Sequence, residues 1–241
     1  MRFVIGTLAA VFVATIAVAA QSGPSAGAGV PSTPVAIELF TSQGCSSCPP
    51  ADAIAARLAR EPNNVLITRP VTYWDRLGWK DTLAREDNTS LQGAYSTKGH
   101  RGSGVYTPQT VIQGGDAAVG SRESELRQLI SAEKRKSGPA ISAVRTDDGG
   151  RSVTIEGAGT GTVTVVALKS ETTVRIGSGE NGGRTVKYIN VALSDTEVGR
   201  WSGGKTIVKI PGSVFQAQGA DRYALIIQSG RAGRIVAARY L

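Results

Sequence analysis

The chain has few of the side chains that bind transition metals. Among its 241 residues there are two cysteines, Cys45 and Cys48, and one histidine, His100. Zinc takes about four protein ligands in a structural site, or about three and a water in a catalytic one. A metal site is therefore the least favoured interpretation of the two cysteines, and we expect neither a metal nor a cofactor.

Aromatic residues are also scarce, and positive charge is not concentrated. Phe, Trp and Tyr make up 5% of the chain, and 27 basic against 19 acidic residues give a net charge of +8. The basic residues are scattered, apart from Lys134, Arg135 and Lys136. Single-stranded nucleic acid is bound by basic grooves with interleaved aromatic side chains. We therefore expect no nucleic-acid partner.

Apolar runs of membrane-spanning length are missing beyond the N-terminus. Residues 3–20 are almost uninterruptedly apolar, Arg2 precedes them, and Ala17 to Ala20 offers a cleavage site of the A-x-A type. This pattern predicts a signal peptide at residues 1–20 and a flexible linker at 21–33; an uncleaved anchor is the less favoured alternative. We expect a periplasmic or secreted protein with no stable membrane insertion after signal removal.

Both cysteines lie in one short motif, Gly44-Cys45-Ser46-Ser47-Cys48-Pro49-Pro50. A cysteine before a helix can be stabilised as a thiolate by the helix dipole and free backbone N–H groups. As a structural cross-link, so short a loop would stabilise the fold by about 2 kcal/mol at most. A mature chain of roughly 200 residues can bury enough core without it. We therefore favour a redox pair over a structural cross-link.

Residues 34–137 alternate between short strands and helices. Apolar periodicity, Gly and Pro predict strands and helices in turn. The X-Pro pair Thr107-Pro108 precedes one strand, and Gly114-Gly115 predicts a hairpin turn. The predicted strands are Val35–Phe40, Val65–Thr72 (bent or at an edge because of Pro70), Gln109–Gln113 and Ala117–Val119. The predicted helices are Asp52–Arg60, Asp87–Thr97 and a third capped by Ser121 and ending near Lys136.

Residues 138–241 are rich in Val, Thr, Ile and Gly. Strand-length runs separated by turns predict a β-rich, sandwich-like C-terminal module, although the same strands could extend the first sheet. The predicted strands are Ala140–Thr146, Arg151–Glu156, Thr162–Lys169, Thr172–Ile176, Thr185–Leu193, Thr206–Ile210, Tyr223–Gln228 and Ile235–Tyr240.

The order of elements in residues 34–137, with the dithiol before the first helix and an X-Pro pair before the third strand, resembles the thioredoxin fold. The segment from Ile37 to Asp52 closely resembles the start of a family of exported thioredoxin-like proteins catalogued as a domain of unknown function (DUF1223). Residues 73–81, 106–109 and 179–191 are similar to its other blocks. The family usually has a His and an Asp where this chain has Pro70 and Thr72, so no role is carried over for them. We expect an α/β protein with a thioredoxin-like domain at 34–137 and the β-rich module at 138–241.

The residues predict a dithiol mechanism. Cys45, which we expect to be the exposed cysteine, would attack a disulfide, and Cys48 would resolve the mixed disulfide. The resemblance implies that Thr107-Pro108 is a cis peptide facing the dithiol, where the Thr107 backbone would pair with substrate. An ordinary turn is the alternative for this pair.

Three further residues are candidates with structural alternatives. Glu38, if buried in a central strand, would have a raised pKa and pass a proton to Cys48; a carboxylate at a strand end, reaching solvent or an Arg, is the favoured alternative. Trp74 and Asp75 would form a substrate-recognition wall or a salt-bridged loop. Glu180-Asn181-Gly182-Gly183 is expected to be a hairpin turn first and an inter-domain or ligand contact second.

The sequence favours an exported thiol–disulfide oxidoreductase acting on protein or small-molecule thiols and disulfides, with a separate redox partner. The alternative is a non-catalytic envelope protein in which the thioredoxin-like half is a binding platform. The large second module and the turn at residues 73–81, which is rich in Trp and charge and is called the Trp-rich turn below, motivate that alternative, because thiol exchange requires neither.

Overall fold

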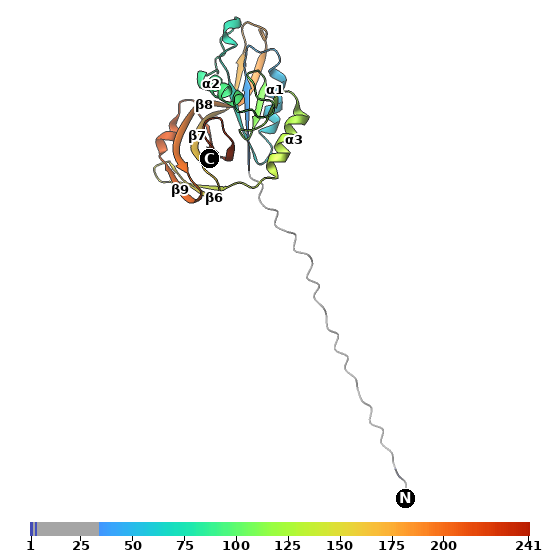
Figure 1. Cartoon of the computed structure of the whole chain (residues 1–241), viewed down its shortest axis with the longest axis vertical. Helices are drawn as coiled ribbons and strands as arrows, with labels where there is room; N and C mark the ends of the chain where they lie inside the picture. The colour runs from blue at the N-terminus through green and yellow to red at the C-terminus, as the bar shows by residue number, and fades with distance from the viewer. Residues whose placement is uncertain (2, 4–33) are drawn as a thin grey trace. The chain divides into compact units, whose positions relative to one another are not determined.

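A mixed β-sheet of eight strands organises the chain (Figure 1). The computed structural model describes residues 1, 3 and 34–241. Apart from residues 1 and 3, the predicted signal peptide and the linker at 21–33 lie outside the described residues. The strand order in the large sheet is β11-β10-β7-β8-β2-β1-β3-β4, and β5-β6-β9 form a second, three-stranded sheet.

The elements of residues 34–137 follow the predicted order. They are β1 (Val35–Thr41), α1 (Pro49–Leu58), β2 (Asn64–Pro70), the 3-10 helix η1 (Asp75–Leu77), α2 (Glu86–Ser96), β3 (Gln109–Ile112), β4 (Ala117–Val119) and α3 (Glu123–Lys134). β1 is parallel to β2 and antiparallel to β3, which pairs with β4 in turn.

Residues 138–241 supply the remaining strands. They are β5 (Ala140–Arg145), β6 (Arg151–Gly157), β7 (Gly161–Arg175), β8 (Thr185–Trp201), β9 (Gly204–Ile210), β10 (Arg222–Gln228) and β11 (Ile235–Tyr240), with the 3-10 helix η2 (Gly212–Gln216) between β9 and β10. Four of these strands extend the first sheet, because β8 pairs with β2 at Thr68 and Val191. The chain is therefore a mixed α/β protein with a mostly β-sheet core.

Alternation along β1 and β2 places two different clusters on the two faces of the large sheet. Ile37 and Leu39 pack with Leu66 against α1 and α3 on one face, and Ala36 packs with Ile67 on the other. A third cluster, which includes Ile155 and Val208 of the small sheet, joins that sheet to β7, β10 and β11 of the large one.

Three local predictions are wrong. The two strands predicted at 162–169 and 172–176 are replaced by one long strand, β7, because Lys169 and Glu171 both pair with β8 and the chain does not turn between them. Ser121 does not cap α3; the N-cap is Arg122, which makes no side-chain capping hydrogen bond. β2 is an internal strand, and Pro70 is tolerated because it is the strand's last residue.

Within the part of the chain that the structure describes, no helix combines the length and apolar character that crossing a membrane requires.

Candidate functional site

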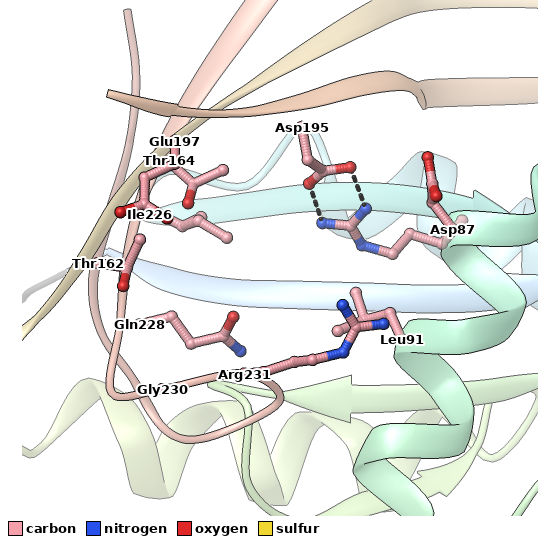
Figure 2. Close-up of a pocket in the computed structure, with 11 residues that line it drawn as sticks. Asp87, Leu91, Thr162, Thr164, Asp195, Glu197, Ile226, Gln228, Gly230 and Arg231 are labelled. Atoms are coloured by element: carbon pink, nitrogen blue, oxygen red, sulfur yellow. Dashed lines mark hydrogen bonds and ion pairs between the residues drawn. The ribbon is translucent and has the colours of Figure 1, made fainter. Parts of the chain in front are cut away.

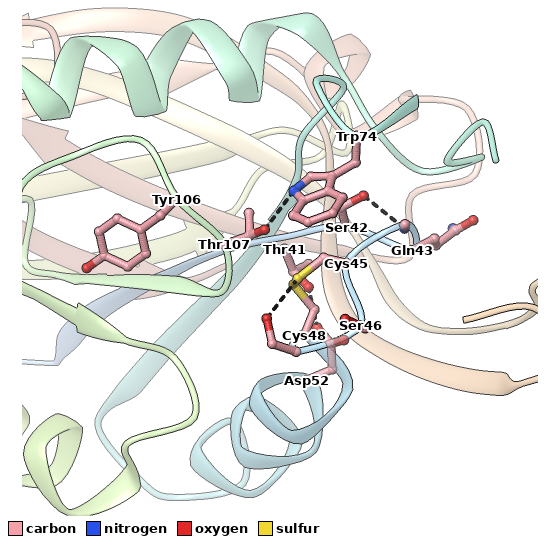
Figure 3. The surroundings of a disulfide bond; sticks show 12 residues. Thr41, Ser42, Gln43, Cys45, Ser46, Cys48, Asp52, Trp74, Tyr106 and Thr107 are labelled. Atoms are coloured by element: carbon pink, nitrogen blue, oxygen red, sulfur yellow. Dashed lines mark hydrogen bonds between the residues drawn. A yellow bond between two sulfur atoms is a disulfide. The ribbon is translucent and has the colours of Figure 1, made fainter. Parts of the chain in front are cut away.

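A disulfide joins Cys45 and Cys48, with 5.4 Å between their Cα atoms (Figure 3). The bond lies in the loop between β1 and α1. α1 begins at Pro49 and has prolines in its first two positions, where a missing backbone N–H is tolerated. Cys48 is the N-cap, so Cys45 lies three residues before the N-cap. The helix dipole therefore acts more directly on Cys48 than on Cys45, because its effect falls off within one turn.

The expectation that Cys45 is exposed is wrong for this disulfide state. Both cysteines are 0% exposed. The hydroxyl of Ser47 lies 3.3 Å from the Cys45 sulfur. Trp74 approaches the loop so closely that a Cβ on Gly44 would lie 3.1 Å from the Trp74 Cβ. Reagents in solution therefore reach this sulfur only after part of its cover moves.

Part of that cover comes from the connection between β7 and β8, residues 176–184, which we call the capping turn. The side-chain amide of Asn181 donates hydrogen bonds to the backbone carbonyls of Gln43, at 2.9 Å, and Cys45, at 2.8 Å. The carboxylate of Glu180 accepts a hydrogen bond from the Ser46 N–H at 3.2 Å. The predicted turn is thus confirmed, and it also fixes the backbone of the cysteine loop.

Trp79 of the Trp-rich turn packs against the capping turn. A Cβ on Gly177 would lie 2.8 Å from the Trp79 ring, so the indole packs directly on the capping-turn backbone. Trp79 Nε1 donates a hydrogen bond of 2.8 Å to the side-chain carbonyl of Gln43. Asp75 accepts a hydrogen bond from the Asp81 N–H, which stabilises the turn itself. Asp75 therefore contributes to the shape of this turn.

The Thr107-Pro108 peptide is cis, as the family resemblance implied. The indole N–H of Trp74 donates a 2.8 Å hydrogen bond to the Thr107 hydroxyl (Figure 3). Pro108 is buried at the start of α1: a Cβ on Gly120 would touch both Pro108, at 3.1 Å, and Ala51, at 3.0 Å. The structure therefore brings Trp74, Thr107 and Pro108 together beside the disulfide loop.

Glu38 is buried, but the structure does not bring it to the cysteines. Alternation along β1 places it on the face opposite Leu39 and α1. Its carboxylate accepts hydrogen bonds from Arg69 Nε at 2.6 Å and from the Tyr95 hydroxyl at 2.5 Å. Burial opposes the charge of Arg69, but Asp195 and Glu38 outweigh it and hold the pKa of Arg69 above its usual range. The favoured alternative, a carboxylate at a strand end reaching solvent or an Arg, is right only about the Arg partner, because Glu38 is buried in the middle of β1.

Asp52 is a site residue that the sequence interpretation missed. It lies one helical turn after Cys48 in α1 and is 4% exposed. Its Oδ1 accepts a 2.9 Å hydrogen bond from the Thr41 hydroxyl, and its buried Oδ2 has no hydrogen-bond partner among the described residues. Burial raises the pKa of Asp52 to about 8; the Thr41 hydrogen bond lowers it and nearby Asp81 raises it further. This carboxyl is a proton donor or acceptor poised near neutral pH.

Asp52 lines a cavity at the side of α1. A cavity of about 400 Å³ between α1 and the start of β8 is lined by Asp52 together with Pro49, Arg57 and Lys187. Burial, and then the charges of Asp52 and Asp81, raise the pKa of Tyr188, which therefore stays protonated in this cluster. The one sequence signal for Asp52 was a lone acidic residue on the apolar face of α1.

Metal ligands are not gathered here. Among the described residues, no three or more His, Cys, Asp or Glu side chains are arranged to hold a metal ion.

Comparison with known proteins identifies relatives over most of the chain. Residues 36–228 match a family model described as a protein of unknown function (DUF1223). A crystal structure of a protein from Agrobacterium tumefaciens is similar, with 31% identity, a TM-score of 0.76 and coverage of 86% of this chain and 93% of the other. HBP35 of Porphyromonas gingivalis shares the fold at 12% identity, with a TM-score of 0.54 over 87% of this chain and 75% of that one. No curated protein matches the chain. On the family match and the Agrobacterium relative, this chain belongs to the DUF1223 family.

Proposed function

We propose that the protein is an exported thiol–disulfide exchange protein that uses Cys45 and Cys48. The N-terminal sequence supports export to the periplasm or the medium. The order β2-β1-β3-β4, the cysteines between β1 and α1, and the cis Thr107-Pro108 before β3 support a thioredoxin-like arrangement. Its substrates are thiols and disulfides of proteins or small molecules.

The observation that carries this proposal is the unpartnered Oδ2 of Asp52, buried one turn from Cys48. Burying a carboxyl without a full set of hydrogen bonds costs stability. A structural cross-link does not need such a group, whereas a cysteine that exchanges a proton does. Asp52 takes the role that the sequence interpretation gave to Glu38.

The exchange balances in electrons and protons. The Cys45 thiolate attacks a substrate disulfide, forming a bond to one substrate sulfur while the other leaves and takes a proton from solvent. Cys48 gives its proton to ionised Asp52 and attacks Cys45, which releases the second substrate sulfur as a thiolate and forms the protein disulfide. Two electrons pass to the substrate. In the reverse direction, protonated Asp52 gives its proton to Cys48 as that sulfur leaves.

Access to Cys45 requires an opening step in this proposal. The cover consists of Trp74, which packs at the edge of the Phe40 cluster, and the capping turn, and hydrogen bonds connect both to their neighbours. Loops attached in this way open locally at a lower free-energy cost than global unfolding. The disulfide therefore reacts through a minor, open population.

The test is a trapping experiment. Cys48→Ser leaves Cys45 without its resolving partner, so mixed disulfides with substrates accumulate on Cys45 and are identified by mass spectrometry after export. The matched control is the Cys45→Ser, Cys48→Ser double variant, which traps nothing. If the single variant folds but carries no mixed disulfide, thiol exchange is contradicted.

A second candidate function is a non-catalytic envelope protein in which the disulfide is a permanent cross-link. The complete burial of both sulfurs favours it. It predicts that the double cysteine variant, if folded, retains its function in cells. The exchange proposal predicts that the same folded variant behaves like a deletion.

A further inference from the structure

A second cavity lies on the sheet face opposite α1. Its volume is about 440 Å³, which is within the range of small-molecule sites, roughly 300–1,000 Å³. Arg69 of β2 forms part of its back wall, and alternation places Arg69 with Ile67 on the face away from Leu66 and α1. The site is therefore distinct from the disulfide and stands without thiol exchange.

Neighbouring strands and one helix build its walls. Cross-strand pairing sets Thr164 of β7 beside Ile226 of β10 and Thr162 beside Gln228. Leu91 of α2 lies across the cavity from them (Figure 2). The hydroxyls of Thr162 and Thr164 make no hydrogen bond with any residue that the structure describes, so they are open to a ligand. Most of the wall is carried by regular secondary structure.

Apart from the Arg69–Asp195 ion pair, the charged groups of this cavity lie along two opposite edges. Figure 2 shows the carboxylates of Asp87, Asp195 and Glu197 along one edge, and Gln228 and Arg231 along the opposite edge. The apolar side chains of Leu91 and Ile226 lie between the two edges. Each of these carboxylates has an arginine partner: Arg69 for Asp195, Arg85 for Asp87 and Arg200 for Glu197. Neither Arg85 nor Arg200 lines the cavity.

A buried ion pair fixes the acidic edge. Arg69, whose side chain is 1% exposed, donates to both oxygens of Asp195, at 3.0 and 2.9 Å, while Glu38 accepts from its Nε. The Asp195 side chain is 31% exposed, and each carboxylate oxygen keeps a second lone pair for a ligand donor. Burial opposes the charge of Asp195, but Arg69 outweighs it and holds the pKa of Asp195 below its usual value. Asp195 therefore stays ionised at neutral pH.

Arg231 supplies the opposite charge. It projects from the β10–β11 connection, and one of its nitrogens donates a 2.7 Å hydrogen bond to the Ser90 hydroxyl of α2. The guanidinium has five N–H donors, so others stay available for a carboxylate. The Ser90 bond holds the guanidinium at the edge of the cavity.

We propose that this cavity binds a small zwitterion of the amino-acid or dipeptide class. The ligand's ammonium group lies against Asp195 and Glu197, its carboxylate lies against Arg231, and its apolar portion packs between Leu91 and Ile226. The Thr162 and Thr164 hydroxyls complete the polar contacts. Charge separation of this kind discriminates against ligands that carry one charge alone, because one edge would then be left without a partner.

The experiment is calorimetric titration of the purified protein with the twenty common amino acids and a panel of dipeptides with free termini. We expect at least one probe to bind. Acetylation of its amino group or amidation of its carboxyl group should weaken binding by about tenfold or more, since each removes a charged contact. Glu197→Gln and Arg231→Gln should weaken the unmodified probe similarly, whereas the exposed Arg175→Gln on β7 should not.

Pairing variants with blocked probes sharpens the test. Glu197→Gln should have little further effect on the acetylated probe, and Arg231→Gln little further effect on the amidated one, because the contact is already lost. The proposal is overturned if no probe in the panel binds, if a bound probe ignores both substitutions, or if a singly charged probe binds as tightly as its zwitterionic parent.

Discussion

The side-chain Nδ2 of Asn181 lies 2.8 Å from the carbonyl oxygen of Cys45, although the two residues are 136 positions apart in the chain. The contact connects the β7–β8 hairpin to the cysteine loop. In the exchange proposal, this contact lets the C-terminal half of the chain limit access to a sulfur in the first half. Thiol exchange with the disulfide should therefore depend on residues of the capping turn.

Asn181→Ala should accelerate reduction of the disulfide by dithiothreitol by about tenfold or more. Two hydrogen bonds to the cysteine loop are lost, and each contributes about 0.5–1.5 kcal/mol net, so the open population increases. The rate is measured by alkylation of the released thiols and mass spectrometry.

Two controls separate local opening from general instability. Arg184→Ala changes an exposed residue of the same turn and should leave the rate unchanged. Ile155→Val destabilises the small-sheet cluster by about 0.5–1.5 kcal/mol and should also leave it unchanged. Equal acceleration in all three variants would contradict a specific role for Asn181.

Trp74→Phe and Thr107→Val remove the same hydrogen bond from opposite ends. Each should speed reduction by about two- to tenfold, as expected for the loss of one neutral hydrogen bond. The double variant should be no faster than the quicker single variant, because the contact can be lost once. Additive effects in this cycle would show that the two residues act independently.

Asp52→Asn should stabilise the disulfide form, with a gain that grows with pH. The folded pKa of about 8 exceeds the unfolded value of 3.8. Between these values the unfolded chain has released a proton that the folded protein still holds, so wild-type stability falls as pH rises through this window. The gain should be small at pH 4 and reach at most about 5 kcal/mol at pH 8.

Urea unfolding at pH 4, 6 and 8 measures this effect, and the exposed Asp116→Asn is its control. The same substitution should flatten the rise of the Cys48 resolving rate between pH 6 and 8, because the proton acceptor is gone. A gain that is equal at all three pH values would rule out a raised pKa for Asp52.

Glu38→Gln should destabilise the protein by about 3–5 kcal/mol, because breaking one side of a buried ion pair leaves Arg69 short of its compensating charge. It should leave the pH dependence of thiol exchange unchanged, since Glu38 lies on the sheet face away from α1. Stopped-flow exchange rates from pH 6 to 8 check this. A shifted pH profile would restore Glu38 as a proton-transfer group.

Local patterns predicted much of the first half of the fold. The apolar run from Val35, the prolines after Cys48 and the glycines at 114–115 each specify their element through short-range physics, and β1, α1 and the β3–β4 hairpin confirm them. The division of β7 into two predicted strands failed at Ser170 and Glu171. Polar residues are usual in turns, whereas these two lie within the long β7–β8 ribbon.

Contacts that depend on strand register could not be predicted from the sequence. The apolar strand around Glu38 allowed for its burial but did not make burial the favoured interpretation, and its contact with Arg69 depends on the parallel pairing of β1 with β2. Likewise, Asp52 is buried because Thr41 and α1 meet across the end of β1, and Asn181 reaches Cys45 through a hairpin formed late in the chain. Neither contact produces a periodic pattern in the sequence from which it could be predicted.

The most direct measurement is the rate of disulfide reduction as a function of dithiothreitol concentration, compared with the global unfolding rate. The account predicts a rate that rises and then levels off at the rate of cover opening, well above the rate of unfolding, with a higher plateau for Asn181→Ala. A fast rate that stays proportional to dithiothreitol would contradict the cover. A rate no faster than global unfolding would contradict thiol exchange and leave the disulfide as a structural cross-link.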